Sequence, residues 1–90
     1  MGDTMKMESL TALPNISKVI AADLQKAGIA TPEELKRLGS KETFIRIRLH
    51  SDSDACLSKL YALEGAIQGI RWHGLSDETK ADLKLFYKSI

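Results

Sequence analysis

The side chains best suited to catalysis or ligand binding lie in residues 69–75, where Trp72 and His73 stand beside Arg71. An indole, an imidazole and a guanidinium this close together are typical of a base-stacking platform or an active site. However, no Ser, Cys or acid stands at a spacing that would form a relay with His73, and such relays are assembled in three dimensions. We therefore expect Trp72 to fill the core where the last two helices join, with Arg71 and His73 fixing that connection.

Two other side chains are candidates for a nucleophile and a proton donor. Cys56 shares one apolar helical face with Leu60, Leu63 and Ile67, so we expect it to be a small buried hydrophobic residue. Glu64 flanks that face, and a carboxylate bonded to a neighbour is favoured over a proton-transfer group. One Cys and two His are too few for a convincing metal site. We predict no catalytic residue, metal or cofactor.

The turn at residues 13–17 is the first of two candidate phosphate-binding elements. Its spacing resembles a helix-hairpin-helix loop, with Asn15 and Ser17 at the two positions for small residues. Asn adopts the left-handed backbone conformation more easily than most residues, and Ser17 could cap the next helix. Amide groups at such a helix start can hold a phosphate without reading any base. The candidate contacts are Asn15, Ile16, Ser17 and Lys18, and the alternative is a tight turn that only closes the fold.

A basic stretch between residues 36 and 50 is the second candidate, because it holds five Lys or Arg and a single acid, Glu42. Such a patch could supply nonspecific phosphate contacts whose affinity falls steeply with salt. The alternative is a solvated face on which some cations pair with acids one helical turn away. Arg46 and Arg48 would lie about 200° apart on a helix, so both cannot line one narrow groove. The candidate residues are Lys36, Arg37, Lys41, Arg46 and Arg48.

Composition restricts the class of protein. The chain has 90 residues, of which 43% are hydrophobic and 28% charged, and these values indicate one small globular domain. A net charge of +1 creates no field that would recruit nucleic acid or an anionic membrane. No apolar run is long enough to span a membrane, the first ten residues lack a secretory signal, and a single Cys fits a reducing compartment. We therefore predict a cytoplasmic protein that is not an enzyme and has no membrane or small-molecule partner.

Helical periodicity and turn signals predict an all-α fold, a five-helix bundle over residues 9–90 that follows a flexible segment at residues 1–8. The first expected helices cover residues 9–13 and 17–27, and Gly28 follows the second. Thr31 and Glu34 form a capping box for a helix that ends at Gly39, after which Ser40 caps the next. Residues 43–49 also alternate like a strand, but no partner strand is visible, so a helix is favoured. The last helix begins at a Ser76 cap.

The residue pattern of segment 54–67 predicts that it forms the central helix. Opposite its large apolar face, small residues recur at Ser58, Ala62, Gly65 and Gly69. A glycine inside a helix costs about 1 kcal/mol relative to alanine, and a neighbouring backbone that lies close to Gly65 would compensate for this cost. The residues predicted for the core are Cys56, Leu60, Leu63, Gly65, Ile67, Trp72 and Phe86.

Several segments together resemble the TfoX C-terminal domain, the C-terminal half of the competence regulator Sxy/TfoX, which also occurs as short stand-alone proteins. The resemblance covers about residues 9–88 and is carried by residues 13–16 (LPNI), 27–29 (AGI), 31–35 (TPEEL), 60–67 (LYALEGAI) and 69–73 (GIRWH). Ser17 stands where the family commonly has Gly. The resemblance implies a bacterial cytoplasmic protein whose N-terminal half has a helix-hairpin-helix-like (SAM-domain-like) fold. It also implies a link to regulation of DNA-uptake genes, where the full-length regulator acts with the cyclic-AMP receptor protein at promoters.

Two functional hypotheses follow. The first is a non-enzymatic regulatory or interaction module that acts through contacts with a protein partner. The second is a weak DNA-binding helix-hairpin-helix domain without sequence specificity, which uses the turn at residues 15–18 and the basic patch at residues 36–48.

Overall fold

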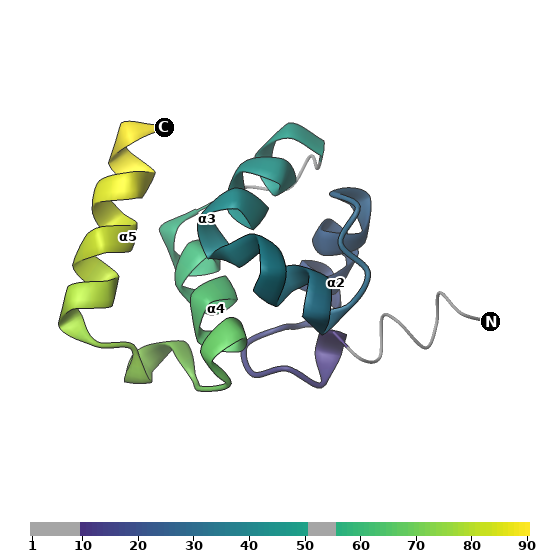
Figure 1. Cartoon of the computed structure of the whole chain (residues 1–90), viewed down its shortest axis with the longest axis horizontal. Helices are drawn as coiled ribbons and strands as arrows, with labels where there is room; N and C mark the ends of the chain where they lie inside the picture. The colour runs from purple at the N-terminus through teal and green to yellow at the C-terminus, as the bar shows by residue number, and fades with distance from the viewer. Residues whose placement is uncertain (1–9, 51–55) are drawn as a thin grey trace.

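The computed structural model describes residues 10–50 and 56–90 of the chain (Figure 1). Within these residues the protein is all-helical and contains no strand. The α-helices are α2 (Lys18–Lys26), α3 (Pro32–His50), α4 (Leu57–Gln68) and α5 (Asp77–Ser89), and a short 3-10 helix, η1 (Trp72–Gly74), connects α4 to α5. The all-α prediction is confirmed, whereas the prediction of five helices is wrong because the described residues form four α-helices.

The observed helices differ from the predicted ones in how residues 32–50 are divided. The sequence predicts separate helices before and after Gly39, and the residues on either side of it form two helical segments of α3 that meet at a kink, where Gly39 has the non-helical angles φ 84° and ψ 164°. This backbone conformation favours glycine because a positive φ of this size strains residues that carry a Cβ, although no neighbouring residue lies within 4 Å of a Cβ built there. The ambiguous residues 43–49 are helical within the second half of α3, as predicted. At the other end, Leu10 and Thr11 are helical, while the predicted flexible segment 1–8 lies outside the described residues.

Side-chain caps fix where three of the helices begin. The Ile20 N–H donates to Ser17 Oγ (3.3 Å) at α2, and the Thr79 N–H donates to Ser76 Oγ (3.1 Å) at α5. At α3 the Glu34 N–H donates to Thr31 Oγ1 (3.2 Å). Each bond satisfies one backbone donor that the first helical turn leaves free. These three predicted caps are confirmed.

Helix α4 is the centre of the fold, as predicted, because it contacts α3, α5 and η1. In Figure 1 it lies between α5 and the part of the molecule that holds α2 and α3. Leu60 and Leu63 are fully buried and belong to one hydrophobic cluster with Leu24 of α2, Phe44 of α3 and Leu83 of α5. Burial of these large side chains stabilises the fold by about 1.5–3 kcal/mol each.

The predicted core needs one correction. Cys56 is exposed rather than buried, because α4 begins at Leu57 and Cys56 precedes it as the N-cap residue, beyond the reach of the core. Ile67, Trp72 and Phe86 are partly buried and pack against the edge of the core cluster.

Candidate functional site

The turn before α2 is built around Asn15, which has the left-handed conformation (φ 69°) that the sequence predicts for it. Its side-chain amide donates to the backbone carbonyl of Ile70 (2.9 Å), and its carbonyl oxygen accepts the N–H of Trp72 (3.1 Å). A longer bond from the same amide reaches the carbonyl of Ala62 in α4 (3.5 Å). We refer to this set of bonds as the Asn15 bridge, because it ties the turn before α2 to the segment between α4 and η1.

Gly65 makes the Asn15 bridge sterically possible. A Cβ atom at this position would lie 2.6 Å from Asn15 Nδ2, 2.8 Å from the Ile70 carbonyl oxygen and 3.1 Å from Trp72 Cα. Two of these three neighbours are backbone atoms, so they cannot turn away as a side chain can. The prediction that a neighbouring backbone lies close to Gly65 is therefore confirmed. The close packing explains why a residue that weakens helices stands in the middle of α4.

These contacts assign the turn's polar side chains to bonds within the protein. The amide of Asn15 forms the bridge, the hydroxyl of Ser17 caps α2, and the side chain of Ile16 is buried. Lys18 is exposed at the start of α2. The structure therefore supports the interpretation that the turn closes the fold, while Ser17 and Lys18 are the two residues of this group that are exposed.

Two of the five basic residues of α3 are paired with carboxylates. Lys41 pairs with Asp82 of α5 (2.7 Å), and Arg46 pairs with Glu42 one turn away (3.1 Å). Lys36, Arg37 and Arg48 are exposed. The bend at Gly39 separates the first two of these from the rest of the predicted patch. Two of the five cations are thus partly neutralised by carboxylates, and one of these pairs, Arg46–Glu42, is of the one-turn kind that the alternative interpretation expects.

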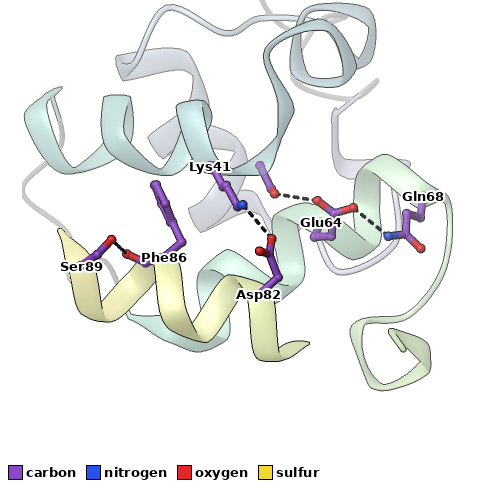
Figure 2. Close-up of polar contacts among 7 residues, drawn as sticks. Lys41, Glu64, Gln68, Asp82, Phe86 and Ser89 are labelled. Carbon is purple, nitrogen blue, oxygen red and sulfur yellow. Dashed lines mark hydrogen bonds and ion pairs between the residues drawn. The ribbon is translucent and has the colours of Figure 1, made fainter. Parts of the chain in front are cut away.

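A cluster of polar contacts joins α3, α4 and α5 (Figure 2). Glu64 accepts a bond from Ser40 Oγ (2.6 Å) and another from Gln68 Nε2 (2.7 Å). The predicted role of Glu64 as a carboxylate bonded to its neighbours is confirmed, while the Ser40 hydroxyl, predicted as a cap, instead bonds across to α4. The ammonium group of Lys41 also lies 5.6 Å from the ring centroid of Phe86. The Lys41 contacts with Asp82 and Phe86 hold α5 against α3, whereas the Ser40–Glu64 bond joins α3 to α4.

Trp72 and His73 lie beside a cleft of about 400 Å³ between the turn before α2, α4 and η1. Their rings are stacked with centroids 3.9 Å apart, and the Tyr61 ring stacks on Trp72 at 5.9 Å. Lys80 lies 6.0 Å from the Trp72 ring centroid and donates to the His73 carbonyl (3.4 Å). Trp72 thus fixes the connection between α4 and α5, although it is only partly buried. The described residues that line the cleft are Asn15, Ile20, Cys56, Ser58, Lys59, Ala62, Arg71, Trp72 and His73.

This cleft contains a thiol and an imidazole, but its described lining includes no carboxylate. A Cys–His relay needs a third group to orient the base, and none of the described lining residues is an acid. Among the described residues there is also no group of three or more His, Cys, Asp or Glu side chains that could hold a metal ion.

The sequence analysis missed one element near this cleft, a buried ion pair between Lys59 of α4 and Asp23 of α2 (2.8 Å). The two side chains are only 10% and 5% exposed. An available signal was the position of Asp23, which directly precedes Leu24 on the apolar side of α2. The position of its partner, 36 residues further along the chain, depends on how α2 packs against α4.

A second hollow lies between the C-terminal ends of α3 and α5. Its volume is about 310 Å³, and its described lining residues are Ile45, Arg48, Leu49 and Ile90. Leu49 is 73% exposed and Ile90 44% exposed. We refer to this hollow as the α3–α5 groove.

Comparison with known proteins assigns the fold to a family. The TfoX C-terminal domain matches residues 6–87, which is most of the chain, so the protein belongs to the TfoX C-terminal domain family. Among curated proteins, none matches.

Two solved structures are similar to the chain. An uncharacterized protein from Listeria monocytogenes, in a triclinic crystal form, is 61% identical with a TM-score of 0.85, and the match covers 89% of this chain and 90% of that one. A protein of unknown function from Listeria monocytogenes, in a tetragonal form, is 60% identical with a TM-score of 0.84, covering 89% and 98%. In residues 10–50 and 56–90, no helix has the length and apolar character needed to cross a membrane.

Proposed function

We propose that this protein is a non-enzymatic regulatory module of the bacterial cytoplasm that acts by binding another protein. The observation that carries the proposal is the set of large apolar side chains at the surface. Val19, Leu49 and Leu85 are 66%, 73% and 69% exposed, and Leu49 and Ile90 share one groove. Single exposed apolar residues are ordinary, but neighbouring ones that line a groove are typical of a protein interaction site.

Two further features support a binding role over catalysis. Membership of the TfoX C-terminal domain family connects the chain to regulation. The side chains that could take part in catalysis lack a free or complete arrangement. Glu64 is bonded to Ser40 and Gln68, and the described residues that line the cleft beside His73 include no acid. The α4-centred core and the Asn15 bridge would then serve to hold a rigid surface.

Affinity capture from the native host, performed with and without nuclease, tests this function. We expect a protein that is retained in a fixed ratio to the bait after nuclease treatment, and that elutes with it in size-exclusion chromatography. Loss of all retained protein on nuclease treatment would contradict the proposal, because the contact would then pass through nucleic acid.

DNA binding by a helix-hairpin-helix-like N-terminal half is the second candidate function. The observation that favours it is the left-handed Asn15 turn directly before the start of α2, with Lys18 exposed beside it. In this case Lys18→Glu would weaken binding to generic duplex DNA, since each phosphate contact contributes to a sequence-independent affinity. An unchanged DNA affinity in Lys18→Glu and in Arg46→Glu would exclude this candidate.

A further inference from the structure

We propose that the cleft between the turn before α2, α4 and η1 binds a small organic anion that carries a planar ring. The inference goes beyond the proposed function, because neither a protein partner nor duplex DNA is the occupant of this cleft. The sequence predicts no small-molecule partner, and the cleft could not be foreseen from it because the described lining comes from three separate parts of the chain.

The cleft has the size of a small-molecule site. Its volume of about 400 Å³ falls within the range of about 300–1,000 Å³ that such sites occupy. Ser58 and Ala62 stand one turn apart on α4 and line the cleft, whereas Gly65, further along the same row of small residues, is covered by the Asn15 bridge. One part of this row therefore makes room for the protein's own backbone, and the other part leaves room for a ligand.

The aromatic side chains of the cleft offer a stacking surface. Trp72 and His73 both line the cleft, and their rings are stacked with centroids 3.9 Å apart. His73 is exposed, and among the described residues Trp72 is the one whose ring contacts it. A flat ring has two faces, so the face of His73 that points away from Trp72 can accept a further ring in the same stack.

The charge of the described lining determines the charge of the ligand. Arg71 lines the cleft, is exposed, and forms no ion pair with another described residue. Lys59 also lines it but is paired with Asp23 (2.8 Å), so it adds no net charge. None of the described lining residues is an acid, and Asp77 and Glu78, which follow η1 on α5, are not among them. A guanidinium group matches a carboxylate or a phosphate through two parallel hydrogen bonds.

Other classes of ligand fit this lining less well. Among the described residues no group of three or more His, Cys, Asp or Glu side chains could hold a metal ion. A cationic ligand would be repelled by Arg71, and a neutral ring would gain no ion pair from it. A ring that carries a carboxylate and a ring that carries a phosphate share the required chemistry, and probes of each kind distinguish the two sources.

Trp72 fluorescence tests the inference directly, because this residue is the only tryptophan of the chain. The ring-bearing anions to be added are adenosine monophosphate and phenylacetate. Adenosine and phenylacetamide keep the ring without the charge, and inorganic phosphate and acetate keep the charge without the ring. We expect at least one ring-bearing anion to change the fluorescence saturably, with an affinity about tenfold or more above those of its neutral and its ringless counterparts. The one that binds more tightly identifies phosphate or carboxylate as the anionic group.

Modification of Cys56 gives a second and independent readout. This exposed thiol lines the cleft, so a bound ligand should slow its reaction with a neutral thiol reagent. The inference is overturned if neither ring-bearing anion protects Cys56 or changes the Trp72 fluorescence, or if a neutral or ringless counterpart binds equally well. A single-stranded oligonucleotide that protects Cys56 at a lower concentration than adenosine monophosphate would also overturn it, because the ligand would then be a nucleic acid.

Matched variants locate the contact. Arg71→Gln should weaken binding of the ring-bearing anion by about tenfold or more and abolish its advantage over the neutral counterpart, without lowering the Tm of the free protein. His73→Ala should also weaken binding, because it removes the stacking surface. Arg37→Gln is the control, since Arg37 is an exposed cation of α3 that does not line the cleft. Equal effects of Arg71→Gln and Arg37→Gln would refute the cleft as the site.

Discussion

Substitution of Gly65 by alanine adds one methyl group at the most crowded point between α4 and its neighbours. The new Cβ would lie 2.6 Å from Asn15 Nδ2 and 2.8 Å from the carbonyl oxygen of Ile70, well inside normal contact distance. Asn15 Nδ2 cannot simply rotate away, because it is bonded to that same carbonyl. The methyl group must therefore displace the Asn15 bridge or move the backbone between α4 and η1.

The expected change in the free energy of unfolding follows from one stabilising and two destabilising contributions. Alanine gains about 1 kcal/mol of helix propensity over glycine. Overpacking costs about 1–3 kcal/mol, and leaving the polar groups of the bridge without partners costs a further 1–3 kcal/mol or so. We therefore expect Gly65→Ala to lower the free energy of unfolding by about 2 kcal/mol despite its better helix propensity. For a domain of this size, that loss lowers Tm by roughly 8–16 °C.

Thermal and urea unfolding followed by circular dichroism measure this loss. Gly74→Ala is the matched control, because a Cβ there would have its nearest neighbour at 3.8 Å, an ordinary contact with a side-chain methyl. Its stability should change far less than that of Gly65→Ala. If Gly65→Ala is as stable as the wild type or more stable, the close packing between α4 and the Asn15 bridge is refuted.

Three further substitutions or reactions probe other parts of the structure. Asn15→Gly keeps a residue that tolerates positive φ but removes the bridge, so it should destabilise the protein by about 1–3 kcal/mol in urea unfolding, and a neutral result would show that the bridge contributes nothing. Lys59→Ala leaves the buried carboxylate of Asp23 without this cation and should cost about 3–5 kcal/mol, measured by the same method, whereas a loss below about 1 kcal/mol would mean that the pair is effectively solvated. Cys56 is exposed, so a thiol reagent should modify it in the folded protein nearly as fast as in urea, and protection by folding would contradict its position before α4.

Local signals in the sequence were sufficient to predict most helix starts. Ser17, Thr31 and Ser76 act as caps because each hydroxyl accepts a bond from an N–H three residues later, and this interaction depends only on neighbours in the chain. The same holds for Asn15, whose tolerance of positive φ is a property of the residue type. The small residue Gly65 indicated a close approach, although the approaching atoms could not be named.

Interactions between distant residues were beyond the sequence signals. Asn15 bonds to residues 55 and 57 positions away, and Lys59 pairs with a residue 36 positions away. Such partners are set by how helices pack, not by local periodicity. The core assignment of Cys56 failed for a related reason, since periodicity placed it on an apolar stripe but did not show that α4 begins only at Leu57. The α3–α5 groove also depends on packing, because the bend at Gly39 sets the direction of the second half of α3.

The salt dependence of binding to generic duplex DNA is the most direct test of the claim that this protein acts through protein contacts. At about 50 mM salt, where nonspecific phosphate contacts are strong, we expect either no measurable binding or an affinity whose logarithm changes little with the logarithm of salt concentration. Tight binding at low salt that weakens steeply as salt is added, and that Lys18→Glu reduces, would contradict the claim and identify the protein as a DNA-binding protein.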